Sequence, residues 1–102
     1  MAGVGTNFIL ERILSLAKAV AAREGYTFAP NCENNLRLLI TSAVTRIQSE
    51  PLNQEHAIRT AENNVEILVL EMVRNATRGD NQLHEDTLEK AKRKLCPLYP
   101  FC

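Results

Sequence analysis

The most continuously apolar stretch of the chain runs from Val65 to Val73, and it constrains the fold more than any other feature. With about 100° of rotation per residue, the apolar positions in and around it recur at i, i+3, i+4 and i+7, the pattern of a helix with one buried face. This face consists of Ala57, Ile58, Ala61, Val65, Leu68, Val69, Met72 and Ala76. The pattern predicts a central helix, with Asn53 as its N-cap and Gly79 just after its end.

Three other segments show apolar positions at the same helical spacing. Gly25 ends the first of them, Asn31 is placed to cap the second, and Pro51 separates the second from the central helix. The sequence therefore predicts an all-α fold, a compact bundle of four helices in one domain. The predicted helices cover about residues 6–24, 31–49, 53–78 and 84–95 of the domain 1–102.

The last seven residues, 96–102, contain two prolines and three large apolar side chains, Leu98, Tyr99 and Phe101. Proline favours an extended backbone. Burying the apolar surface of these three side chains is energetically favourable. We therefore expect an extended but ordered tail, packed either on its own bundle or on a partner.

Ile67 and Leu70 lie outside the buried face of the central helix, on its back. They are three residues apart, so their side chains adjoin on the helix surface. Either another helix of the same chain covers them or a second chain does. Ile67 and Leu70 are candidate interaction residues, as are the three apolar residues of the tail.

Charge balance weighs against general nucleic-acid binding, because twelve basic and twelve acidic residues leave no net charge. The one basic cluster, Lys90, Lys92, Arg93 and Lys94, follows acidic residues in the last helix. Acidic residues near the start of a helix and basic residues near its end match the helix dipole. The position of the basic cluster therefore has a structural explanation that needs no bound phosphate. The alternative function is nucleic-acid association through these four residues.

No residue pattern predicts a catalytic, cofactor or metal site, so an enzyme is not expected and neither is a cofactor. Zinc sites usually show close pairs of Cys or His such as C-x2-C. Among Cys32, Cys96, Cys102, His56 and His84, the only close pair is Cys96 and Cys102, with five residues and two prolines between them. Cys32 reads as an inert buried thiol, with a reactive thiol in the first helical turn as the alternative. A further alternative function is that of a thiol sensor, in which Cys96 and Cys102 form a reversible disulfide.

The location expected from the sequence is the cytoplasm. The first residues lack the basic region of a signal peptide, and Glu11, Arg12 and Lys18 interrupt the first apolar segment. No apolar run reaches the length of a membrane span, so no membrane contact is expected. Three cysteines without an export signal fit reduced thiols better than a disulfide framework.

The last predicted helix opens with the residues Leu83-His84-Glu85-Asp86-Thr87-Leu88-Glu89-Lys90-Ala91. With the two helices before it, this opening makes residues 36–95 resemble the histone fold, whose last helix follows a hydrophobic-Thr-x-x-Asp opening. His84 stands where that family usually has Thr, and Asp86 is displaced by one position. The resemblance implies that a long helix with two apolar faces belongs to a dimer.

These observations predict a non-enzymatic helical module that binds protein, with a second copy of itself, a homodimer, as the expected partner. The pattern does not identify any other partner.

Overall fold

Four helices and two short strands make up the computed structural model, which describes residues 5–50 and 53–102. In chain order they are α1 (Thr6–Arg23), β1 (Thr27–Phe28), α2 (Pro30–Gln48), α3 (Gln54–Arg74), β2 (Gln82–Leu83) and α4 (Glu85–Leu95). The all-α four-helix fold predicted from the sequence is confirmed.

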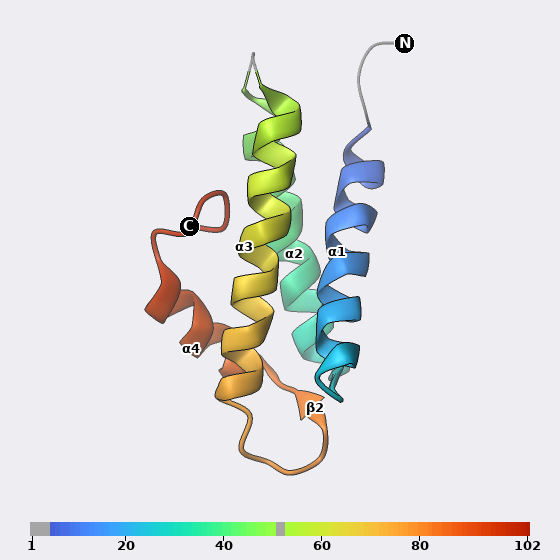
Figure 1. Cartoon of the computed structure of the whole chain (residues 1–102), viewed down its shortest axis with the longest axis vertical. Coiled ribbons are helices and arrows are strands. Elements are labelled where there is room, and N and C mark those ends of the chain that lie inside the picture. Colours follow the sequence, from blue (N-terminus) through green and yellow to red (C-terminus); the bar gives the residue numbers. More distant parts are fainter. Residues whose placement is uncertain (1–4, 51–52) are drawn as a thin grey trace.

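The first three helices run side by side, each antiparallel to the next (Figure 1). α3 packs against both α1 and α4, and α1 also packs against α2. α4 is shorter and runs back along α3, so the C-terminal tail ends beside the middle of the bundle (Figure 1). α3 is therefore the central element, although no helix within residues 5–50 and 53–102 covers its outer side.

The core is built from the apolar faces that the helical period predicted. Ile13 of α1, Leu36 and Ile40 of α2, and Val65 and Val69 of α3 are fully buried. Leucine, isoleucine and valine at this spacing place their side chains on one side of each helix, where they exclude water from the centre. Each such side chain stabilises the fold by roughly 1.5–3 kcal/mol through burial.

The two-stranded sheet was not predicted from the sequence. β1 and β2 pair in parallel, with Thr27 opposite Gln82 and Phe28 opposite Leu83. The Ala29 N–H extends the ladder by donating to the Leu83 carbonyl at 2.9 Å. The sheet fastens the α1–α2 connection to the α3–α4 connection at one end of the bundle. Strands of two residues are too short to show a periodic pattern.

The start of α2 and the end of α3 differ from the prediction, and α3 starts at the predicted N-cap but without its capping hydrogen bond. The N-cap of α2 is Ala29, and the helix starts at Pro30, which fits because the first turn needs no N–H from the proline. Asn53 is the N-cap of α3, but its φ is 62° and its side chain makes no capping hydrogen bond. α3 ends at Arg74, before Gly79, and the side-chain amide of the next residue, Asn75, donates to the Glu71 carbonyl at 2.8 Å.

Candidate interaction surfaces

Ile67 and Leu70 are exposed on the outer face of α3. Their exposed fractions are 45% and 37%, whereas the apolar residues on the opposite face of the same helix are buried. No helix among residues 5–50 and 53–102 covers the pair, so the intrachain explanation from the sequence does not apply to the described chain. We call the face that carries Arg59, Asn63, Ile67, Leu70 and Arg74 the α3 outer stripe.

Ion pairs lie on both sides of the α3 outer stripe. Toward α1, Glu62 accepts from the Arg12 Nε at 2.8 Å, and Glu66 accepts from an Arg23 terminal nitrogen at 3.2 Å. Toward α4, Glu71 lies 3.1 Å from the Lys94 Nζ. These pairs hold the three helices together and leave the aliphatic pair of the stripe between two charged borders.

The C-terminal tail packs on the bundle as predicted, but its apolar residues differ in exposure. Phe101 is only 5% exposed and belongs to the core, whereas Leu98 and Tyr99 are half-buried. Phe101 is therefore covered by its own chain and is not available as a surface contact. Burial of the large phenylalanine side chain stabilises the fold. The sequence of the tail has no periodic pattern that shows which of its apolar residues is buried.

The tail also differs from the expectation of three reduced thiols. Cys96 and Cys102 form a disulfide with Cα atoms 5.7 Å apart, while Cys32 is a free and buried thiol. Arg46 of α2 donates to the carbonyls of Pro100 and Cys102. The disulfide and this arginine together shape the last seven residues into a closed loop beside α2 and α3.

Leu38 of α2 is a further exposed aliphatic that the sequence reasoning did not single out. It is 67% exposed and borders a groove between α2 and α4 that also contains Leu39 and Leu88. The exposed residues of α2 from position 31 to 45 are Asn31, Asn34, Leu38, Ser42 and Thr45, none of them charged. This face could have been recognised in the sequence, because the polar side of the predicted helix carries no charged residue over these positions.

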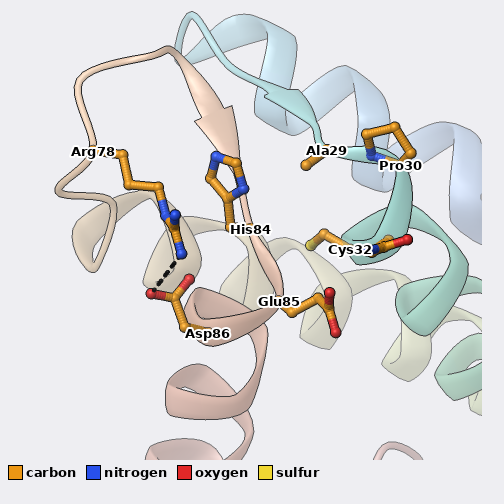
Figure 2. A pocket seen from close by; sticks show the side chains of 8 residues that line it. Ala29, Pro30, Cys32, Arg78, His84, Glu85 and Asp86 are labelled. Atoms are coloured by element: carbon orange, nitrogen blue, oxygen red, sulfur yellow. Dashed lines mark ion pairs between the residues drawn. The ribbon is translucent and has the colours of Figure 1, made fainter.

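A pocket lies where the N-termini of α2 and α4 meet beside the sheet (Figure 2). Its charged groups have polar partners: Arg78 pairs with Asp86 at 3.6 Å, and Glu85 accepts from the Asn35 amide at 3.1 Å. His84 lies 2.7 Å from a carboxylate oxygen of Asp80. The charged and polar side chains Arg78, His84, Glu85 and Asp86 of the pocket thus already have partners within the chain.

Cys32 lines the same pocket (Figure 2) and has a fully buried side chain. Burial raises the pKa of its thiol to about 12, and the nearby carboxylates of Glu85, Asp86 and Glu33 add to the effect. Because the thiolate is the nucleophilic form, the thiol is inert at neutral pH. The inert interpretation of Cys32 is therefore supported.

The basic residues at the end of α4 are partly engaged within the chain. Lys94 pairs with Glu71, and Lys92 lies 3.7 Å from Glu89. Lys90 and Arg93 are exposed. Half of the proposed nucleic-acid surface thus has a carboxylate beside it, which lowers its local positive charge.

Neither a group of metal ligands nor a membrane-spanning helix is present among the described residues. Residues 5–50 and 53–102 contain no group of three or more His, Cys, Asp or Glu side chains placed to hold a metal ion. None of the helices within these ranges combines the length and the apolar character needed to cross a membrane.

The chain matches no known protein family, no curated protein and no solved structure.

Proposed function

We propose that this protein is a non-enzymatic helical interaction module that associates with a second copy of itself through the α3 outer stripe. The observation that carries the proposal is the exposure of Ile67 and Leu70 side by side on the central helix. Single exposed aliphatic residues are common on soluble proteins. An adjoining pair between two borders of ion pairs forms a small apolar centre with a polar rim, the usual anatomy of a protein interface.

The stripe is complementary to itself. In an antiparallel pairing of two α3 helices, a two-fold axis between Ile67 and Leu70 sets Ile67 of one copy against Leu70 of the other. The same axis sets Arg74 opposite Asn63, so the centre brings no charges of the same sign together. An interface with this symmetry uses one patch twice, as homodimers with two-fold symmetry do.

The carboxylates beside the stripe favour this arrangement. Glu66 and Glu71 already have cationic partners in their own chain, Arg23 and Lys94. Bringing a second helix close therefore does not bury unpaired charges, which would oppose association. Because the apolar centre is small, we expect a reversible dimer whose population rises with concentration.

The proposal keeps the cytoplasmic location expected from the sequence. Disulfides in the cytosol are usually transient, so this location is compatible with a Cys96–Cys102 disulfide that is present only part of the time. The proposal assigns no reaction to Cys32, whose pKa is raised to about 12 chiefly by burial.

The test is the solution mass by light scattering over a wide concentration range, for the wild type and two variants. The double variant Ile67→Ser, Leu70→Ser should remain monomeric at concentrations where the wild type dimerises. The matched control is Leu38→Ser, which removes an even more exposed leucine from a different helix. It should dimerise as the wild type does.

Two results would overturn the proposal outright, and a third would move the interface to another helix. One is a wild type that stays monomeric at every concentration. The other is a double variant that keeps the dimer but melts several degrees lower, which would make Ile67 and Leu70 supports of the fold. A dimer that is lost only in the Leu38→Ser control would move the interface to α2.

A further inference from the structure

The Cys96–Cys102 disulfide closes the C-terminal tail into a ring at the protein surface. Both cysteines are exposed, whereas the third cysteine, Cys32, is buried. The disulfide therefore joins two solvent-exposed residues, which a thiol in solution can approach. The Cys32 thiol is buried and inert, so it does not compete for either sulfur.

The ring contains one residue of the core, although the two cysteines that close it are exposed. Phe101 is 5% exposed and the preceding Pro100 is buried, so the turn between the two cysteines points into the bundle. Within the turn, the Phe101 N–H donates to the Leu98 carbonyl at 2.7 Å. The tail thus joins a reactive surface group to an apolar side chain that contributes to the core.

Two side chains of the bundle hold the backbone of the tail. The Arg46 guanidinium donates to the Pro100 carbonyl at 3.4 Å and to the Cys102 carbonyl, and it lies 5.0 Å from the centre of the Tyr99 ring. The Asn64 amide donates to the Tyr99 carbonyl. These contacts are separate from the sulfur atoms, so the disulfide adds restraint and does not itself form the docking surface.

We propose that the Cys96–Cys102 disulfide is a site of reversible thiol–disulfide exchange, and that its reduction releases the tail from α2 and α3. The inference does not depend on the proposed dimer, because none of its contacts uses the α3 outer stripe.

The exchange needs a dithiol reductant. One thiolate of the reductant attacks Sγ of Cys96 or Cys102, forms a mixed disulfide and expels the other cysteine as a thiolate, which takes up a proton. The second thiol of the reductant then displaces the first cysteine. Two electrons pass to the protein, which gains two thiols, while the reductant becomes a cyclic disulfide. A disulfide oxidant reverses the reaction.

Release follows from chain entropy. The ring limits the conformations that the undocked tail adopts, so docking the tail costs little conformational entropy. Opening the ring gives the undocked tail many more conformations, while the contacts of Arg46 and Asn64 stay as they are. The equilibrium therefore shifts toward the undocked state, in which Phe101 and its core neighbours become accessible.

The test uses the oxidised full-length protein with and without dithiothreitol under native conditions. Alkylation with iodoacetamide followed by mass spectrometry should place labels on Cys96 and Cys102 only after reduction. Chymotrypsin should then cleave after Leu98 and Phe101 on the order of tenfold faster than in the oxidised protein, since even a short loop changes the equilibrium by at least this factor. Circular dichroism should show the same helix content before and after reduction.

The double variant Cys96→Ser, Cys102→Ser should be cleaved at the fast rate without any reductant. Its control is Cys32→Ala, which leaves the ring intact and should keep the slow rate and its response to dithiothreitol. If the double variant does not fold, reduction of the wild type still decides the question.

The proposal is overturned if dithiothreitol leaves the disulfide intact in the native protein, because the bond would then be inaccessible to exchange. It is also overturned if both cysteines become alkylated while cleavage after Leu98 and Phe101 keeps its oxidised rate. A loss of helix content on reduction would equally contradict it, since the disulfide would then support the whole fold.

Discussion

The carboxylate of Glu71 on α3 lies 3.1 Å from the Nζ atom of Lys94 on α4, and the two side chains differ greatly in exposure. Only 9% of the Glu71 side chain is exposed, against 59% for Lys94. The hydrogen bond from Lys94 lowers the pKa of Glu71 below its ordinary value of 4.5; burial opposes this shift, and the Asn75 amide adds to it. This pair joins the short last helix to the centre of the bundle.

The pair predicts a loss of stability in acid. Because the pKa of Glu71 is lower in the folded state, its contribution is present above the unfolded pKa and is lost as the pH falls through the folded one. The Tm of the wild type should exceed that of Glu71→Gln at neutral pH, and the difference should shrink as the pH falls below the ordinary carboxyl pKa of 4.5 and through the lower folded-state pKa. The control is Glu89→Gln, which changes an exposed pair and should shift the Tm little. Parallel Tm curves for the wild type and Glu71→Gln would contradict the prediction.

Burial of Phe101 predicts that the tail stabilises the fold. Replacement by alanine removes a large apolar side chain from the core and should lower the free energy of unfolding by about 3 kcal/mol, measured by urea denaturation. Phe8→Ala is the matched control, because Phe8 is 62% exposed, and it should change the value by less than about 0.5 kcal/mol. Equal effects of the two substitutions would show that the tail does not pack as described.

The buried thiol predicts selective labelling. With a pKa of about 12, the fraction of Cys32 present as thiolate is on the order of one in ten thousand at pH 8. Iodoacetamide should leave the native oxidised protein unlabelled and should label Cys32 once urea unfolds it, as read by mass spectrometry. Rapid labelling of Cys32 in the native protein would indicate an accessible and reactive site.

The engaged lysines predict weak nucleic-acid affinity. Lys92 and Lys94 have carboxylate partners, and the chain carries no net charge, so phosphate contacts release few counterions. Fluorescence anisotropy with a labelled DNA duplex should detect no binding at low salt. Binding that weakens steeply with salt, and that falls further in Lys90→Ala, Arg93→Ala, would favour the nucleic-acid alternative instead.

The four helices and most of the core could be predicted from the sequence. Ile13, Leu36 and Val65 lie at positions where the helical period places them inside, and all three are buried. The helix ends were predicted less well, because Asn31 and Gly79 have the residue types of caps but not the positions. Local preference for a cap is worth about 1 kcal/mol, and tertiary packing easily outweighs it.

The parallel strand pair lay beyond the reach of the sequence. Phe28 and Leu83 come from connections far apart in the chain, and each strand has two residues. Their pairing depends on how the bundle aligns the α1–α2 and α3–α4 connections at one end. A contact of this kind has no local pattern, because it is set by the positions of the helices that flank it.

By itself the sequence determined that this chain forms helices, and which side of each helix faces inward, because the spacing of apolar residues is a local property of the backbone. Only the tertiary structure decided which apolar residues outside those faces are covered. It buries Phe101 and leaves Ile67 and Leu70 exposed, although all three are similarly apolar. Coverage depends on which segments reach a given surface. Here α1, α4 and the tail cover the sides of α3 that face them, and no segment among residues 5–50 and 53–102 covers the α3 outer stripe.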